Sequence, residues 1–161
     1  MAIVRLFLAL GLLIFTFRPE TVADNSSLPS FAWPVAGPVV DEDDGHPSPA
    51  RKIGIDILVP KGTEVRASLA GTVIYAGDTL KTYGNLILIR HEGGWVTVYA
   101  HNDELYVNRG DQVRTGDIIA RSGDTGFTAR PELYFEIRKG AVPIDPAHYL
   151  SLLKPQEPED P

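Results

Sequence analysis

The chain has 161 residues, a formal net charge of −6, a sequence isoelectric point of about 5.1 and no cysteine. This length suits one domain with an N-terminal extension, and the acidic balance gives no basic footprint for nucleic acid. Without cysteine there are no disulfides, thiol nucleophiles, thiolate metal ligands or lipidated N-terminal cysteine.

Residues 1–23 have the pattern of a secretory signal peptide. Arg5 supplies a positive charge, an apolar run extends from Leu6 to Phe17, and Thr21-Val22-Ala23 offers a small residue for cleavage. Arg18-Pro19-Glu20 ends the run before the roughly 20 apolar residues of a membrane span. The alternative is an uncleaved anchor. We expect cleavage, no membrane span in the mature protein and a periplasmic or secreted location.

Residues 24–50 are interpreted as a lead-in that contains an acidic, proline-rich loop. Phe31-Ala32-Trp33-Pro34-Val35 predicts a strand that packs Trp33 into the core. The loop Asp41–Pro49 carries acidic residues and a histidine, which suit a hard cation. It lacks the ligand spacing of a calcium loop, so we expect a solvated charge run.

From Gly54 onward, short alternating segments predict strands. The expected strands are Ile55–Val59, Val65–Leu69, Gly71–Ala76, Leu86–Arg90, Trp95–Ala100, Gln112–Val113, Ile118–Arg121 and Pro131–Arg138. No segment after the signal shows a helical period, which favours an all-β antiparallel sandwich or partly open barrel. Pro143–Leu150 predicts a closing turn of helix, and residues 151–161 a disordered tail.

Five motifs follow one another in this region. They are Lys52-Ile53-Gly54-Ile55-Asp56, Gly84-Asn85, Tyr99-Ala100-His101, Gly123-Asp124-Thr125-Gly126 and Glu132-Leu133-Tyr134-Phe135-Glu136-Ile137-Arg138. Together they resemble the motifs of LytM/lysostaphin-type zinc metalloendopeptidases, which cut peptide bridges of bacterial cell walls. The resemblance implies the duplicated hybrid motif of that family over residues 51–150.

The resemblance also implies an altered metal site. The family writes the first motif as His-x-Gly-x-Asp and the last as His-x-His-Phe-Glu. Asp56 matches a zinc ligand and His101 a catalytic histidine, but Lys52 and Tyr134 stand at ligand positions and Glu132 at a catalytic histidine. Zinc needs about three ligands with lone pairs, which a lysine ammonium lacks. We expect no zinc or other cofactor and no catalytic residue, with Asp56, His101 and Glu132 vestigial.

Other site chemistries remain open. Zinc could be held by recruited histidines, of which His46 lies on the acidic loop. His91 is expected to be exposed at a hairpin turn, and His148 to be a surface residue. A different enzyme could use an acid/base pair drawn from three carboxylates, Asp56, Glu132 and Glu136.

Without a metal, the polar residues are expected to stabilise the site by ion pairs. Lys52 can neutralise Asp56, and Glu132 can pair with His101 or Arg130. We expect a partner-binding groove lined by Lys52, Asp56, His101, Glu132 and Tyr134. Tyr134 is either the aromatic anchor of this groove or a filler of the vacated metal cavity.

The implied function is a non-catalytic module of the cell envelope. Degenerate LytM-type domains of the EnvC and NlpD kind activate cell-wall amidases, and this sequence resembles them in its signal, altered site and intact core motifs. We expect it to bind and activate a peptidoglycan amidase or other wall hydrolase, or to bind peptidoglycan. The alternative is a divergent zinc endopeptidase. The Gly-Asp turns also resemble biotinyl and lipoyl carriers, but no Met-Lys-Met hairpin is present.

Overall fold

The computed structural model describes residues 28–40 and 54–151. In this part of the chain, ten β-strands and two short 3₁₀ turns form. The elements are β1 (Val39–Val40), β2 (Ile55–Leu58), β3 (Glu64–Arg66), β4 (Gly71–Gly77), β5 (Asn85–Arg90), η1 (Glu92–Gly94), β6 (Trp95–Leu105), β7 (Gln112–Val113), β8 (Ile118–Ser122), β9 (Glu132–Lys139), β10 (Val142–Ile144) and η2 (Pro146–His148). No helix among these residues is long and apolar enough to cross a membrane.

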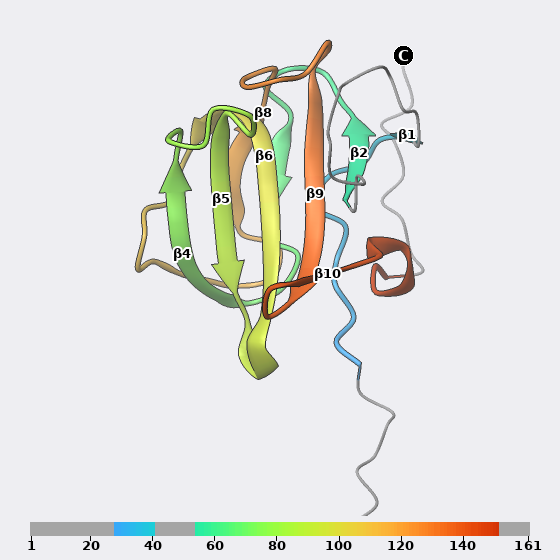
Figure 1. Ribbon diagram of the computed structural model, residues 1–161, viewed down its shortest axis with the longest axis vertical. Helices are drawn as coiled ribbons and strands as arrows, with labels where there is room; N and C mark the ends of the chain where they lie inside the picture. The colour runs from blue at the N-terminus through green and yellow to red at the C-terminus, as the bar shows by residue number, and fades with distance from the viewer. Residues whose placement is uncertain (1–27, 41–53, 152–161) are drawn as a thin grey trace, which may run out of the picture.

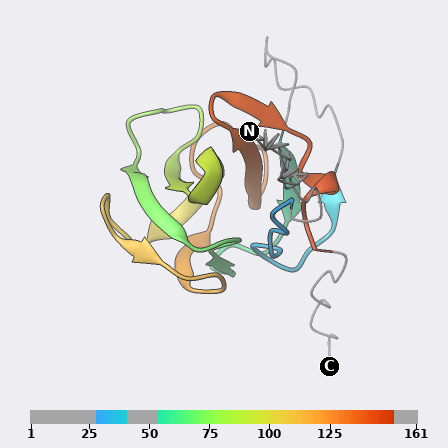
Figure 2. The same cartoon turned by 90° about the horizontal axis from the view of Figure 1, so that it is seen from below.

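The strands form one antiparallel sheet that curls on itself. Its main order is β1-β2-β9-β6-β5-β4-β7, while β10 pairs with β9, and β3 pairs with β8, which joins β6. In Figure 1, β4, β5, β6, β9 and β2 stand side by side, with β3 and β8 behind them. Figure 2 shows the same sheet from below, curved around an interior. This architecture confirms the expected all-β, partly open fold.

β6 connects the two parts of the curl. Its first part pairs with β5 and β9, and its last part pairs with β8 from Asn102 to Leu105. His101 lies at the junction with a φ of 64°. The sequence predicted that this strand ends at Ala100, because polar residues then interrupt the alternation. The structure instead continues the strand through a bend at His101.

Alternate residues of the strands fill the interior. In β9, Leu133, Phe135 and Ile137 are completely buried, as their alternation predicted. The strands around them contribute the other large buried side chains, among them Ile57, Ile87, Ile89, Tyr99 and Ile119. Each such side chain contributes about 1.5–3 kcal/mol by leaving water. The same alternation turns Tyr134, Glu136 and Arg138 to the opposite face of the sheet.

The segment before β1 packs onto the core in a way that corrects one expectation. Phe31 is completely buried and forms an isolated parallel bridge with Leu150, but no strand forms at Trp33. Trp33 is only half-buried, and its indole Nε1–H donates to the Ser151 carbonyl at 3.0 Å. An indole keeps its N–H near a polar partner, so the smaller Phe31 ring occupies the interior.

The closing segment is partly as predicted. η2 supplies the expected helical turn, and Asp145 Oδ1 caps it by accepting a hydrogen bond from Ala147 N–H at 2.9 Å. His148 is exposed, as expected. The sequence missed β10 because Pro143 argues against a strand, yet proline is tolerated on an edge strand, and β10 pairs only with β9.

His91 is buried, which corrects the expectation of an exposed histidine. Its side chain faces inward because the alternation of β5 continues one residue past the end of the strand. His91 Nδ1 lies 2.9 Å from the Ala70 carbonyl oxygen, and Nε2 lies 2.8 Å from Thr97 Oγ1. The Thr97 and Tyr99 hydroxyls are 3.0 Å apart. Because a carbonyl only accepts, Nδ1 carries the proton, and a neutral ring then accepts at Nε2.

Stability is expected to decrease in mild acid because of His91. Burial lowers the pKa of His91 below its usual value of 6.5. Just below pH 6.5 the unfolded chain therefore holds more protons than the folded protein, so the free energy of unfolding rises with pH in this window. The contribution is complete above that window and is lost as the pH falls through the folded pKa.

Urea unfolding of the wild type and of His91→Gln tests this expectation. We expect the stability of the wild type to fall between about pH 7 and pH 5, and His91→Gln to show a shallower dependence. The same pH dependence in both proteins would contradict a titrating, buried His91.

Candidate functional site

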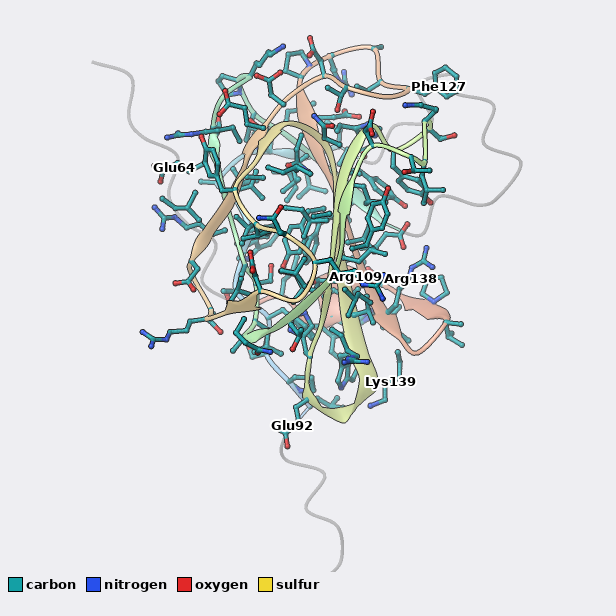
Figure 3. All side chains as sticks on the ribbon, turned by 90° about the vertical axis from the view of Figure 1, so that its left-hand side faces the viewer. Glu64, Glu92, Arg109, Phe127, Arg138 and Lys139 are labelled. Carbon is teal, nitrogen blue, oxygen red and sulfur yellow. The ribbon has the colours of Figure 1, made fainter. Side chains whose placement is uncertain are left out.

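The outward side chains of the central strands form the candidate site. Directly paired residues of antiparallel strands share one face, so the register defines three rows. The rows are Asp56–Tyr134–Ala100, Glu136–Val98–Leu88–Tyr75 and Arg138–Val96–Arg90–Thr72. We call these three rows the outer face. Figure 3 labels Arg138 of the third row, together with Phe127 in the loop before β9 and Lys139 at the end of β9.

Tyr134 occupies the centre of the first row. β2 places Asp56 opposite it on one side, and β6 places Ala100 opposite it on the other. A side-chain carbon added to Gly54 would lie 2.7 Å from Cε2 and Cζ of Tyr134. The glycine of the first motif is therefore needed here because the phenol ring passes close to the backbone. Any larger residue would displace the ring.

Tyr134 is linked along its own strand to Glu136 and Arg138. The Tyr134 hydroxyl donates to Glu136 Oε1 at 2.5 Å, and Arg138 Nε–H donates to Glu136 Oε2 at 2.5 Å. Glu136 is only 3% exposed, so these bonds replace the water that its carboxylate has lost. We call these three residues the Tyr–Glu–Arg relay. Both carboxylate oxygens are engaged, which disfavours an acid/base role for Glu136.

The relay keeps the phenol protonated. Burial raises the pKa of Tyr134 far above its usual value, and the hydrogen bond to the Glu136 carboxylate raises this pKa further. The same carboxylate raises the pKa of Arg138 through its hydrogen bond. Tyr134 therefore presents a hydrogen-bond donor that is already directed at Glu136, at the position where the motif resemblance implies a zinc-binding imidazole.

His101 is held in a strained conformation beside Tyr134. Its φ of 64° lies in the left-handed region, which costs a non-glycine residue about 1–3 kcal/mol. His101 Nδ1 donates to the Thr125 carbonyl at 2.7 Å, and its backbone N–H donates to the Tyr83 carbonyl at 2.9 Å. The His101 ring centroid lies 6.1 Å from that of Tyr134. His101 thus joins the loops before β5 and β9 to the outer face.

Glu132 has one of its two expected partners. It is 5% exposed, and Oε1 accepts a hydrogen bond from Thr128 Oγ1 at 2.9 Å. Arg130 Nε lies 3.8 Å from Oε2. Glu132, the first residue of β9, therefore pairs with Arg130 of the preceding loop, whereas the Nδ1 of His101 is directed at Thr125.

Asp56, His101 and Glu132 thus lie around Tyr134 or next to the loop that precedes β9. Two other residues that the sequence indicated fall outside the described residues. Lys52, with its expected ion pair to Asp56, and His46, as a recruited ligand, remain predictions. His91 is hydrogen-bonded through both ring nitrogens within the core and cannot be recruited. The structure adds Tyr83, whose ring centroid lies 6.0 Å from that of Tyr134.

The side chains that the structure describes do not fit a zinc ion. Within residues 28–40 and 54–151, no group of three or more His, Cys, Asp and Glu residues could hold a metal. The protonated Tyr134 hydroxyl has its proton directed at Glu136, and zinc binding would require that proton to leave.

A separate cleft lies away from these residues. It has a volume of about 570 Å³ and is lined by residues such as Arg66, Val113 and Ile118. Its two carboxylates serve local turns, since Asp111 Oδ2 accepts from Asn108 N–H and Asp117 Oδ2 from Arg114 N–H. The turns predicted at these Gly-Asp pairs are thereby confirmed. The cleft itself contains no pair of groups arranged for chemistry.

Comparison with known proteins identifies the fold family. The chain matches the family described as Peptidase family M23 over residues 50–146. This chain belongs to peptidase family M23. The match confirms the resemblance that the motifs implied, and the matched range contains Lys52, Glu132 and Tyr134.

Relatives and solved structures agree with this assignment. The chain is 38% identical over 149 residues to the Escherichia coli K12 lipoprotein YgeR, covering 84% of this chain and 57% of YgeR. It is 39% identical over 126 residues to the murein hydrolase activator NlpD of the same organism, covering 78% of this chain and 32% of NlpD. A peptidase M23 structure from Pseudomonas aeruginosa superposes with a TM-score of 0.65 and 30% identity, covering 76% of this chain and 52% of that one. The chain thus spans less than two thirds of each of these relatives.

Proposed function

We propose that this M23 domain is a non-catalytic module of the cell envelope that binds and activates a peptidoglycan amidase. The observation that carries the proposal is the Tyr–Glu–Arg relay. At a position where the family places a zinc ligand, Tyr134 donates to a buried carboxylate that is itself neutralised by Arg138. The site is therefore internally satisfied without a metal, which suits binding and not hydrolysis.

The similarity to NlpD supports the same proposal. NlpD is named a murein hydrolase activator and is 39% identical to this chain over 126 residues. The signal-like segment of residues 1–23 fits a periplasmic or secreted location, where both amidases and peptidoglycan are present. Peptidoglycan itself is a second ligand of the proposed module.

The proposed binding surface is the Tyr134 end of the outer face. The sequence contributes Lys52, Asp56, His101, Glu132 and Tyr134 to it, and the structure adds Tyr83 and Arg138. Tyrosine and arginine are the residues that most often dominate the energy of protein interfaces. In this proposal His101 and Glu132 have no catalytic role and instead position the loop that carries Thr125 and Arg130.

Digestion of labelled peptidoglycan by purified components tests the proposal. We expect the mature chain alone to release no fragments, to contain no stoichiometric zinc by elemental analysis, and to increase digestion by an amidase from the same cell. Release of fragments by the chain alone, inhibited by a chelator, would establish the divergent endopeptidase instead.

A histidine-restored variant provides the matched control. Lys52→His, Glu132→His and Tyr134→His together return the residue types of the peptidase motif. We expect this triple variant to gain zinc affinity and to lose amidase activation, since it removes the relay. Stoichiometric zinc in the wild type as well as in the triple variant would contradict the proposal.

A further inference from the structure

The third row of the outer face carries two arginines. Arg90 pairs with Val96, and Val96 pairs with Arg138, so the two arginines flank one valine on the same face. Neighbouring strands are about 4.8 Å apart, which separates the two arginine backbones by about 10 Å. This spacing allows both guanidinium groups to reach one bound segment.

The two arginines differ in what neutralises them. Arg138 Nε–H donates to Glu136, and a third of the Arg138 side chain remains exposed, at 33%. Arg90 is exposed and, among the described residues, its side chain makes no hydrogen bond or ion pair. Glu136 therefore cancels one of the two positive charges, and the row retains one unbalanced positive charge.

An apolar band separates the arginines from the Tyr134 end. Val98 and Leu86 form its floor, and Tyr75, Tyr83 and Leu88 pack against them while remaining partly exposed. A bound segment that crosses this band needs apolar side chains to cover it. Large apolar side chains of this kind are typical of the buried core of a protein–protein interface, so the band favours a protein segment.

We propose that Arg90 and Arg138 form a carboxylate-binding pair for an acidic, amphipathic segment of the activated amidase. This inference rests on the proposed function and specifies the chemistry of the partner. The apolar side chains of the segment cover the band around Leu88, and its acidic side chains lie over the third row. Arg90 thus fixes the direction in which the segment crosses the outer face, because the Tyr134 end offers no equivalent unpaired arginine among the described residues.

Charge reversal at Arg90 tests this inference with the full mature chain. The affinity of the purified amidase is measured for the wild type, Arg90→Glu and Arg114→Glu at low and high salt. Arg114 is also exposed, and its hydrogen bonds to Asp117 within a distant turn involve only its backbone N–H and carbonyl. We expect Arg90→Glu to weaken amidase binding about tenfold and to reduce the salt dependence of this binding. Arg114→Glu should bind the amidase as the wild type does, and both variants should keep the melting temperature of the wild type.

Other results would overturn the inference in distinguishable ways. Equal amidase binding by the wild type and Arg90→Glu would reject the carboxylate-binding pair while leaving the proposed function intact. If Arg90→Glu no longer sediments with purified peptidoglycan but still binds the amidase, Arg90 binds the wall polymer instead. Failure of the wild type to bind any amidase of the cell would reject the proposed function and this inference together.

Discussion

Arg138→Ala is expected to lower the free energy of unfolding by about 2–3 kcal/mol, although a third of the Arg138 side chain is exposed. The cost arises at Glu136, which is 3% exposed and would retain only the Tyr134 hydroxyl as a partner. Removing one member of a fully buried ion pair costs about 3–5 kcal/mol. The expected loss is smaller here because water can replace part of the exposed guanidinium.

A double variant separates this cause from a loss of packing. Glu136→Gln removes the charge that Arg138 neutralises, so Arg138→Ala combined with Glu136→Gln is expected to regain more than half of the lost stability. Urea unfolding followed by circular dichroism measures the difference. Arg90→Ala serves as the control, because its exposed side chain is expected to change stability by no more than about 0.5 kcal/mol. An unfolding curve of Arg138→Ala that matches the wild type would show that the relay does not stabilise the fold.

The strands could be predicted because their information is local. In β9, a side chain every second residue enters the core, so Leu133, Phe135 and Ile137 reveal both the strand and its inward face. The same alternation identifies Tyr134 as outward. A prediction of this kind depends only on neighbours along one strand.

The partners of these side chains could not be predicted in the same way. Tyr83 meets Tyr134 only because the loop before β5 lies beside the His101 bend, where the His101 N–H binds the Tyr83 carbonyl. That bend needs a φ of 64° at a histidine, which no local rule requires. His91 was misjudged for a related reason: a histidine near two glycines resembles an exposed turn, but inside the core the Ala70 carbonyl accepts from Nδ1–H and the Thr97 hydroxyl lies within hydrogen-bond distance of Nε2.

Part of the Tyr–Glu–Arg relay could nevertheless be predicted from the sequence. Tyr134, Glu136 and Arg138 follow one another at every second position, which places them on one face of a strand. An arginine two residues from a buried carboxylate is a natural partner for it. The sequence indicated Glu136 only as part of the last motif or as a possible acid, and it indicated no site role for Arg138.

Tyr134→Ala is expected to abolish amidase activation while leaving a folded protein. The ring is half-buried between Tyr83 and His101, with centroids 6.0 and 6.1 Å away. Truncating a completely buried aromatic residue costs about 3–5 kcal/mol; half of that, about 2 kcal/mol, is expected here. The exposed part of the wild-type Tyr134 ring is available to a partner, as is the exposed part of the Arg138 side chain.

Three further variants decide between an anchor and a cavity filler. Tyr134→Phe retains the ring but removes one donor from Glu136, so we expect a loss of about 1 kcal/mol in stability and partial activation. Lys52→Glu is expected to weaken activation if the sequence-based assignment of Lys52 to this surface is correct. Tyr106→Ala makes the same truncation at a tyrosine that is 48% exposed and bonded to Glu104 and Arg121, and activation should be unaffected. If Tyr134→Ala activates as well as Tyr106→Ala but unfolds far more easily, Tyr134 fills the space of the lost metal, and the partner must bind elsewhere.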